Sequence, residues 1–307
     1  MFEKEMVKQE EAAQQLPSAF AAKLKDYYLL MKFSLSFTVV FSCVVCYLLV
    51  PGIEFDLISV LLLFLGGLLV TGSANAINQV VEKDTDAMMK RTAKRPVASG
   101  RMGADEGWTF AIITGVLGVF IIGWWFNWLA AGLSAFSLFV YAFVYTPLKK
   151  INSVAVLIGA VPGALPCLIG WVAGTAEMSR GGWALFALQF FWQFPHFWAI
   201  AWVSHNDYSK AGFKLMPSDA GPTKYSAIQA ITYSLVLIPV GVLPYFLAIS
   251  GIASLIIVTL ANLFMVWQCV RLYKEMDVKA ARRVMFSSYI YLPVVLLAML
   301  ADKTPIP

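Results

Sequence analysis

The sequence predicts an all-α, polytopic membrane protein in which nine transmembrane helices surround a central cavity open to the cytoplasmic side. The first observation is composition: the 307 residues are 60% hydrophobic and only 13% charged, and a mean hydropathy of +0.73 excludes an ordinary soluble domain. The second is length, because a helix needs about 20 apolar residues to cross a bilayer. Nine stretches meet this need, at 27–50, 57–80, 108–126, 128–147, 153–174, 182–204, 228–250, 252–271 and 284–300.

The third observation is the distribution of basic residues. Of the 23 Lys and Arg residues, all but Arg180 and Lys303 fall in residues 1–32 or in the connections after the second, fourth, sixth and eighth stretches. Because cytoplasmic loops carry the excess of Lys and Arg, we expect a cytoplasmic N-terminus and a C-terminus outside. Arg101 and Lys303 are then predicted on opposite sides of the membrane.

The chain begins MFEKEMVKQEEAAQQ, which is mixed in charge and has no apolar core. This pattern is typical of neither a secretory signal peptide nor an Arg-rich transit peptide. We expect residues 1–26 to form a cytoplasmic tail and residues 27–307 to form a single transmembrane domain. The expected location is a bacterial inner (plasma) membrane, with the lipid bilayer as a partner and no nucleic acid.

A polar stripe descends the second predicted helix. Because a helix turns about 100° per residue, Asn78, Glu82 and Asp86 share one face, and Asp84 faces away. Carboxylates at i and i+4 lie about 6 Å apart and repel each other by roughly 3 kcal/mol at an effective dielectric constant of about 20. A divalent cation removes this repulsion, and amide and carboxylate oxygens suit Mg²⁺. The stripe therefore predicts a Mg²⁺ site at Asn78, Glu82 and Asp86.

Four basic residues follow the stripe directly, namely Lys90, Arg91, Lys94 and Arg95. Such a cluster can bind phosphate oxygens, so stripe and cluster together predict a site for a metal and a polyphosphate. The alternative is that these bases only set the topology of a cytoplasmic loop. That alternative leaves the aligned acids unexplained.

A second polar line follows the sixth predicted helix. If the helix is continuous, Gln193, His196 and Asp207 lie on one face, although Pro195 can bend it locally. A His within a membrane span is a functional candidate, and a buried His that is satisfied by a neighbouring hydrogen bond is an equal alternative. His205, nearer the interface, is expected to be solvated or to support a ligand-binding residue, and not to be a ligand itself.

The connection after the fourth predicted helix reads YTPLKK and brings Tyr145, Lys149 and Lys150 to the same cytoplasmic level. The fifth helix then contains GAVPGALPCLIGW, in which Pro162 and Pro166 alternate with glycines. Such a helix can pack closely on a flat ligand or simply on a neighbouring helix, and the sequence leaves both readings open.

A metal–diphosphate site beside an aromatic-rich intramembrane cavity suits a substrate with a charged head and a long apolar tail, as in isoprenoid diphosphates. Mg²⁺ and basic side chains would stabilise the departing diphosphate. Aromatic faces could stabilise the carbocation that remains.

The chain resembles a known family, the intramembrane (UbiA-type) prenyltransferases. Within it, the chain looks most like the heme branch, the protoheme IX farnesyltransferases or heme O synthases. NQVVEKDTDAMMKRTAKRP resembles that branch's first signature, PHFWAIAW with DYSKAGFKLMP its second, and YTPLKK with GAVPGALPCLIGW its middle one. The resemblance spans all nine predicted helices.

The resemblance implies roles for individual residues. Asn78, Glu82 and Asp86 match the metal–diphosphate motif. The residues that match positions for contacts with the diphosphate or substrate are Arg91, Lys94, Arg95, Tyr145, Lys149, Asp207 and Lys210. His196 matches a position implied to contact heme. One departure is that many members carry a second D-x-x-x-D cluster, whereas Asp207 stands alone here. We therefore expect Asp207 and Lys210 to meet the diphosphate or waters of the first metal.

The implied reaction transfers farnesyl from farnesyl diphosphate to the 2-vinyl group of heme B, with addition of water, and gives heme O. Heme A synthase or a terminal oxidase is implied as an assembly partner. The nearest alternative is the same chemistry on an aromatic acceptor such as a quinone precursor. Alternatives of another class are a membrane transporter, which predicts polar residues continuing to the outer face, and a heme-binding chaperone, which leaves the acidic stripe unexplained.

Overall fold

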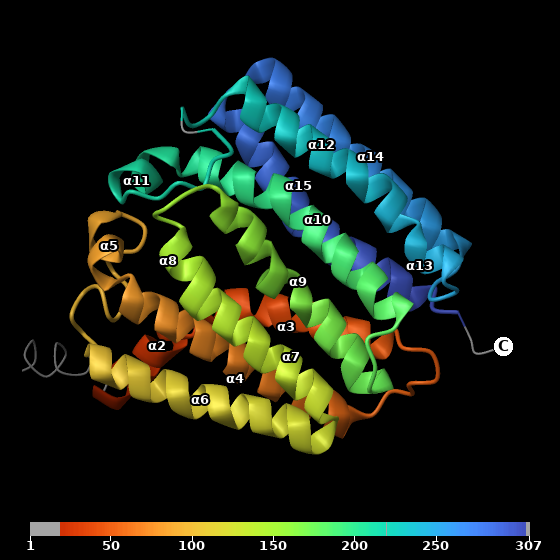
Figure 1. The fold of residues 1–307 in the computed structure, drawn as a ribbon, viewed down its shortest axis with the longest axis horizontal. Coiled ribbons are helices and arrows are strands. Elements are labelled where there is room, and N and C mark those ends of the chain that lie inside the picture. The colour runs from red at the N-terminus through yellow and green to blue at the C-terminus, as the bar shows by residue number, and fades with distance from the viewer. Residues whose placement is uncertain (1–18, 219, 305–307) are drawn as a thin grey trace, which may run out of the picture.

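The computed structural model describes residues 19–218 and 220–304. In this part of the chain all regular secondary structure is helical, apart from one isolated β-bridge between Ser250 and Lys303, so the predicted all-α class is confirmed. The long helices lie side by side across the molecule (Figure 1). They are α3 (Phe33–Leu48), α4 (Leu57–Val81), α6 (Ala104–Trp125), α7 (Trp128–Phe139), α9 (Val154–Thr175), α10 (Arg180–Val203), α12 (Lys224–Gly241), α14 (Ile252–Glu275) and α15 (Val278–Ala301).

Shorter helices begin, extend or join these long ones. They are α2 (Ala19–Leu30), α5 (Lys83–Met88), the π-helix η1 (Val140–Tyr145), α8 (Thr146–Leu148), α11 (His205–Lys210) and α13 (Leu243–Phe246). The third and fourth predicted stretches are joined by a tight turn at Asn127. Its side chain accepts a hydrogen bond from Ala130 N (2.9 Å) and so caps the first turn of α7.

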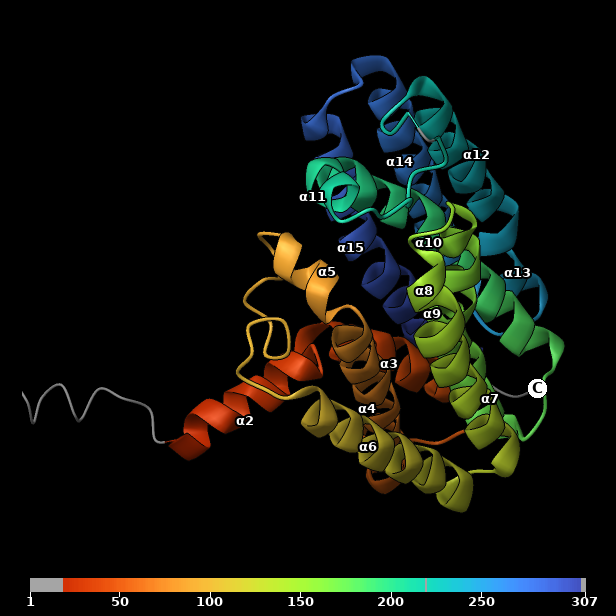
Figure 2. The same ribbon diagram turned by 60° about the vertical axis from the view of Figure 1, so that its left-hand side comes forward.

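The first predicted span, 27–50, is broken. The axes of α2 and α3 differ by 50°, and the bend falls at Lys32, whose φ of 49° and ψ of 55° are left-handed. A non-glycine residue adopts this conformation at a cost of roughly 1–2 kcal/mol, so the surrounding contacts must hold it there. Residues 19–30 accordingly leave the bundle as a separate arm (Figure 2).

The number of spans is smaller by strict criteria than the predicted nine. Seven helices of the described chain are long and apolar enough to cross a bilayer, and the bent α2–α3 pair makes up to eight. The remaining predicted span, the sixth at 182–204, coincides with α10, whose 24 residues include Gln189, Gln193, Pro195 and His196. These polar residues and the proline lower its hydropathy, so the count of nine stays a prediction.

The helices form two groups joined by α3 and α9. The helices α4, α6 and α7 pack on one another in one group, and α10, α12, α14 and α15 in the other. Helix α3 contacts α4, α9 and α15, while α9 contacts α3, α7 and α10. Figure 1 shows α3 and α9 between the two groups.

A cavity of about 270 Å³ lies between the groups. Its lining comes from α3, α4, α6, α7, η1, α9, α10 and α15, and most of the lining side chains are apolar. The expectation that all nine helices surround the cavity is therefore wrong in part. Within the described residues, α12 and α14 pack behind α10 and α15 and contribute nothing to the lining.

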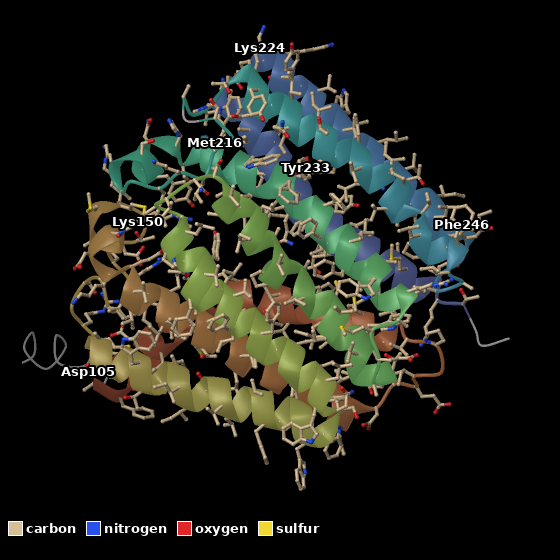
Figure 3. The ribbon with its side chains drawn as sticks, viewed as in Figure 1. Asp105, Lys150, Met216, Lys224, Tyr233 and Phe246 are labelled. Atoms are coloured by element: carbon tan, nitrogen blue, oxygen red, sulfur yellow. The ribbon has the colours of Figure 1, made fainter. Side chains whose placement is uncertain are left out.

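The two ends of the bundle differ in character. Lys150 and Asp105 lie at the end that carries α5 and α11, whereas Phe246 lies at the other end (Figure 3). At that other end Lys303 donates hydrogen bonds to Leu48 O (2.8 Å) and Ile53 O (3.1 Å). Helices α5 and α11 hence mark one end of the bundle, and Lys303 marks the opposite one.

Candidate active site

The predicted acidic stripe lies at the C-terminal end of α4. The helix does not run on to Asp86 as expected, because Glu82 leaves helical geometry (φ −97°, ψ 11°) and α5 begins after it. However, Glu82 N still donates to Asn78 O (3.0 Å), and Asp86 N to Glu82 O (2.7 Å). Because this i→i+4 pattern continues across the break, the three side chains stay together, while Asp84 is exposed as predicted.

Asn78, Glu82 and Asp86 each pair with one basic side chain, and the three basic side chains come from different segments of the chain. Lys32 Nζ donates to Asn78 Oδ1 (2.9 Å) from the α2–α3 bend. Lys149 Nζ lies 2.6 Å from Glu82 Oε1, just after α8. Arg95 Nη1 donates to Asp86 Oδ2 (2.6 Å) from the loop after α5. We call these six residues the paired-charge site.

Four of the six residues of the paired-charge site are buried, and Lys32 and Arg95 are half-buried. Asn78, Glu82 and Asp86 are 2%, 5% and 0% exposed, and Lys149 is 7% exposed. A buried charge is tolerated when it is paired, and losing one partner typically costs about 3–5 kcal/mol. Burial lowers the pKa of Lys149, and the adjacent Glu82 carboxylate opposes that shift.

One oxygen of the paired-charge site remains available. Asp86 Oδ1 is buried and has no hydrogen-bond partner among the described residues, although Oδ2 of the same carboxylate is paired with Arg95. No group of three or more His, Cys, Asp or Glu side chains in the described chain could hold a metal. Two carboxylates and one amide fit Mg²⁺, which usually keeps several waters and uses only one or two protein carboxylates.

The π-helix η1 connects the paired-charge site to the cavity. It carries Tyr141 and Tyr145, whose ring centroids are 5.3 Å apart and which both line the cavity. Lys149 Nζ lies 4.9 Å from the Tyr145 ring centroid, a cation–π distance. Tyr145 packs so closely on Gly159 of α9 that a Cβ there would lie 2.6 Å from its ring. The glycine in the predicted middle signature therefore admits this tyrosine.

Helix α11 approaches the site from the other group of helices. Arg91 Nη2 donates to Tyr208 Oη (3.0 Å), and the Arg91 guanidinium carbon is 5.6 Å from the Tyr208 ring centroid. Phe213, which follows α11, lies 5.4 Å from Lys149 Nζ. These contacts bring the segments after α4, α8 and α10 together at one end of the bundle.

Three predicted site residues are not in contact with the paired-charge site. Asp207 is half-buried on α11, and Lys94 and Lys210 are exposed. None of their side chains has a hydrogen-bond or ion-pair partner in the described residues, although Lys94 O accepts a bond from Arg101 (3.1 Å). Asp207 does not share a continuous helix with His196, because α10 ends at Val203.

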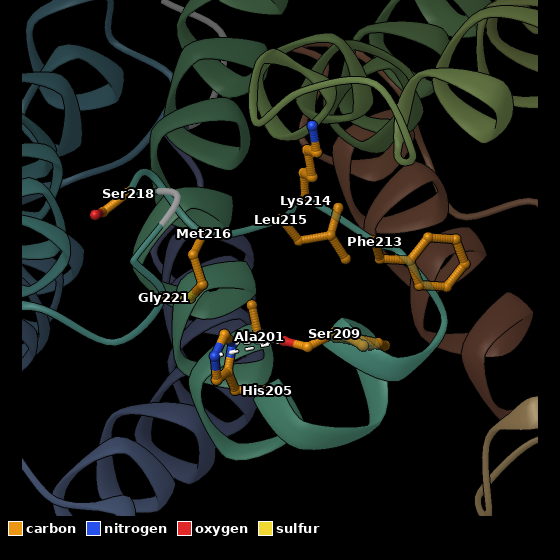
Figure 4. A pocket seen from close by; sticks show the side chains of 10 residues that line it. Ala201, His205, Ser209, Phe213, Lys214, Leu215, Met216, Ser218 and Gly221 are labelled. Carbon is orange, nitrogen blue, oxygen red and sulfur yellow. Dashed lines mark hydrogen bonds between the residues drawn. The ribbon is translucent and has the colours of Figure 1, made fainter.

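A separate pocket of about 210 Å³ lies beside α11. Its lining includes His205, Ser209 and Met216 (Figure 4). His205 lies 3.5 Å from Ser209 Oγ, at the limit of hydrogen bonding. This pocket shares Tyr208 and Phe213 with the surroundings of the paired-charge site, and none of its described lining residues is acidic.

His196 lies inside the bundle and lines the cavity. Its Nδ1 is 2.7 Å from Ser288 Oγ of α15, and its ring stacks on Trp192 with centroids 4.7 Å apart. His196 is thus satisfied at one ring nitrogen and also lines the cavity, so its functional role stays a prediction.

The structure thus joins Asn78, Glu82, Asp86, Arg95 and Lys149, all predicted from sequence. It adds Lys32 and Tyr208, which the sequence reasoning missed. Lys32 interrupts an apolar stretch, and that interruption was the available signal.

The fold and the site define an integral membrane protein with a buried, paired-charge site at one end of a mostly apolar cavity. The model of the UbiA prenyltransferase family matches residues 39–290, and the chain belongs to this family.

Curated relatives agree over nearly the whole chain. The chain is 44% identical to the protoheme IX farnesyltransferase of Cytophaga hutchinsonii over 287 residues, which covers 92% of this chain and 99% of that protein. It is 39% identical to the protoheme IX farnesyltransferase of Flavobacterium psychrophilum, covering 91% and 94%.

Solved structures show the same fold at lower identity. A digeranylgeranylglyceryl phosphate synthase aligns with a TM-score of 0.76 at 23% identity and covers 92% of this chain and 98% of that one. A UbiA homolog from Archaeoglobus fulgidus, bound to GPP and Mg²⁺, aligns with a TM-score of 0.67 at 15% identity and covers 89% and 99%.

Proposed function

We propose that this chain transfers the farnesyl group of farnesyl diphosphate to the 2-vinyl group of heme B, with addition of water, and so forms heme O and diphosphate. The observation that carries the proposal is the paired-charge site at the edge of an apolar cavity, which suits an anionic head with a long tail. Full-length similarity to proteins named protoheme IX farnesyltransferase supports this acceptor over an aromatic one.

The diphosphate binds where cations converge. Lys32, Arg95 and Lys149 contact it from three segments, and Arg91 with Tyr208 contacts it from the side of α11. Charge-assisted hydrogen bonds to phosphate oxygens are about twice as strong as neutral ones. Lys94, Lys210 and Asp207 lie further out and contribute to capture of the substrate or to its hydration shell.

Asn78, Glu82 and Asp86 hold Mg²⁺ in this proposal, and the unpartnered Asp86 Oδ1 is the oxygen that supports it. When bound, Mg²⁺ supplies positive charge that stabilises the diphosphate as a leaving group. The GPP and Mg²⁺ in the Archaeoglobus fulgidus homolog are consistent with this assignment.

Side chains of the protein then stabilise the two charges that form when the substrate ionises. The allylic C–O bond breaks, its electron pair leaves on the diphosphate, and Lys149 and Arg95 stabilise that charge. The faces of Tyr141 and Tyr145 stabilise the farnesyl cation, and the apolar lining excludes water from it. The vinyl π electrons then form the new C–C bond, and water adds to the cation next to the porphyrin and loses a proton.

Residues 27–307 act in this proposal as one transmembrane prenyltransferase domain in a bacterial plasma membrane, with the paired-charge site toward the cytoplasm. The bias of Lys and Arg toward that end of the bundle supports the orientation. An assembly partner such as heme A synthase or a terminal oxidase stays a prediction.

The test is a membrane assay with heme B, farnesyl diphosphate and Mg²⁺, read by mass spectrometry. We expect a porphyrin that has gained one farnesyl group and one hydroxyl group, and we expect a chelator to abolish it. If folded protein gives no adduct with heme B but prenylates aromatic acids, the acceptor in this proposal is wrong.

The paired-charge site itself is tested by Glu82→Gln. Removing the carboxylate charge is expected to lower turnover by about a hundredfold or more, as for loss of a preorganised electrostatic group. The matched control is Asp84→Asn, two residues away and exposed, which should retain activity. Equal activity of both variants would contradict the assignment.

A further inference from the structure

On the cavity side of α10, two consecutive hydrogen bonds connect His196 to Ser288 and Ser288 to the backbone of α15. His196 Nδ1 lies 2.7 Å from Ser288 Oγ, and Ser288 Oγ donates to Met285 O one turn earlier (2.6 Å). Ser288 is 0% exposed and His196 is 9% exposed, so water does not compete for these contacts. The helices α10 and α15 lie against each other along this region (Figure 1).

The contacts of Ser288 favour one tautomer of His196. A serine hydroxyl carries a single hydrogen, and Ser288 Oγ is placed to donate it to Met285 O. When Ser288 donates there, its Oγ meets His196 as an acceptor and the imidazole carries its proton on Nδ1. In a neutral imidazole with Nδ1 protonated, Nε2 carries a free lone pair.

Nε2 has no hydrogen-bond partner among the described residues, and it is not among the polar atoms sealed from solvent. Since His196 lines the cavity, the free lone pair is accessible there. The ring plane is fixed as well, because Trp192 stacks on it at an interplanar angle of 19° and the Tyr289 ring meets it edge-on with centroids 5.2 Å apart.

We propose that Ser288 is a positioning residue that holds His196 in the Nδ1-protonated form, so that Nε2 binds the iron of the heme substrate from inside the cavity. The inference rests on the proposed function for the identity of the ligand. Histidines that bind metals commonly donate their other ring N–H to an oxygen acceptor, and loss of that acceptor typically costs 10–100-fold in metal affinity.

The tautomer can be measured without heme. The chain has 2 histidines, so protein labelled with ¹⁵N-histidine gives two sets of ring signals, and His205→Gln identifies which set belongs to His196. We expect the Nδ1-protonated form in the native chain and a shift toward the Nε2-protonated form in Ser288→Ala. An Nε2-protonated His196 in the native chain would overturn the inference, whatever the protein's activity.

Heme titration of the purified protein tests the ligand. We expect an absorption spectrum of histidine-ligated heme, an affinity about tenfold lower in Ser288→Ala, and recovery in Ser288→Thr. His196→Asn keeps a group able to donate to Ser288 but removes Nε2, so it should lose the histidine-ligated spectrum. Unchanged spectra and affinities in both Ser288→Ala and His196→Asn would overturn the inference.

Ser234→Ala is the matched control. Ser234 is equally buried and its hydroxyl also donates one turn back, to Ile231 O (2.8 Å), but it does not line the cavity. We expect native heme binding in this variant. If the native protein forms heme O while Ser288→Ala binds heme normally, only the inference fails. If the native protein binds no heme, the proposed function fails with it.

Discussion

Both the backbone and the side chain of Lys32 contribute to the paired-charge site. Its left-handed backbone turns α2 away from α3, and this turn directs the ammonium group to Asn78 Oδ1 (2.9 Å). The site thus has three cations against two carboxylates. The excess positive charge suits an anionic ligand. Because Lys32 pairs with a neutral amide and not with a carboxylate, it is the cation that can most easily exchange its partner for such a ligand.

We predict that Lys32→Met raises the KM for the prenyl diphosphate by roughly ten- to a hundredfold and changes kcat less. The reason is loss of a charge-assisted hydrogen bond worth about 1.5–3 kcal/mol, while Lys149 and Arg95 stay in place to stabilise the leaving group. Steady-state kinetics in membranes would measure the split. Lys25→Met is the control, because Lys25 is exposed on α2, and equal KM values for the two variants would contradict the role of Lys32.

Helical periodicity allowed the sequence to predict that three residues of this site lie together. Asn78, Glu82 and Asp86 recur every four positions, and that spacing alone places them together. Lys32 meets Asn78 across 46 positions, and Tyr208 meets Arg91 across 117. Such contacts depend on how helices pack, which no local pattern contains. The resemblance to a family supplied Lys149, which spacing could not.

At the scale of elements, α9 holds the two groups of helices together through small residues. Gly170 lies against the backbone of α3, where a Cβ would collide with Cys43 O. The two helix backbones can approach this closely only because glycine has no side chain. The position and width of the cavity between the groups depend on this contact.

We predict that Gly170→Ala destabilises the protein by about 1–3 kcal/mol, the usual cost of overpacking, because a backbone carbonyl cannot rotate away as a side chain can. Thermal unfolding in detergent would measure it. Gly132→Ala on α7 is the control: a Cβ there meets nothing within 4 Å, so improved helix propensity should leave stability unchanged or raise it slightly. A Gly170→Ala protein as stable as the control would show that α3 and α9 can separate without cost.

The helix break that hydropathy missed is the one at Lys32, because it falls inside the apolar stretch 27–50. The stretches 57–80 and 182–204, by contrast, end within a residue of α4 and α10. Beyond Glu82 and Ser204 the expectation of continuous helices came from the polar lines drawn to Asp86 and Asp207. At these positions side-chain pairing and short loops replace apolar packing, so periodicity carried past the apolar segment does not predict where the helix ends.

For the whole molecule, the decisive property is that its two ends differ. The paired-charge site, α5 and α11 occupy one end, and the contacts of Lys303 with Leu48 and Ile53 occupy the other. The site that we propose for the diphosphate head lies at the first end. The side of the membrane that this end faces therefore determines from which compartment the diphosphate enters and leaves.

We predict that the paired-charge end faces the cytoplasm, and cysteine labelling can test it directly. All four native cysteines are buried, so they should give little background with a membrane-impermeant thiol reagent. Lys279→Cys, exposed in the first turn of α15, reports the paired-charge end, and Glu177→Cys, exposed between α9 and α10, reports the opposite end. In intact spheroplasts Glu177→Cys should be labelled at once and Lys279→Cys only after permeabilisation, because the end richer in Lys and Arg is retained inside. The reverse labelling pattern would place the paired-charge site on the outer side of the membrane. Its diphosphate substrate would then have to be supplied from outside the cell membrane.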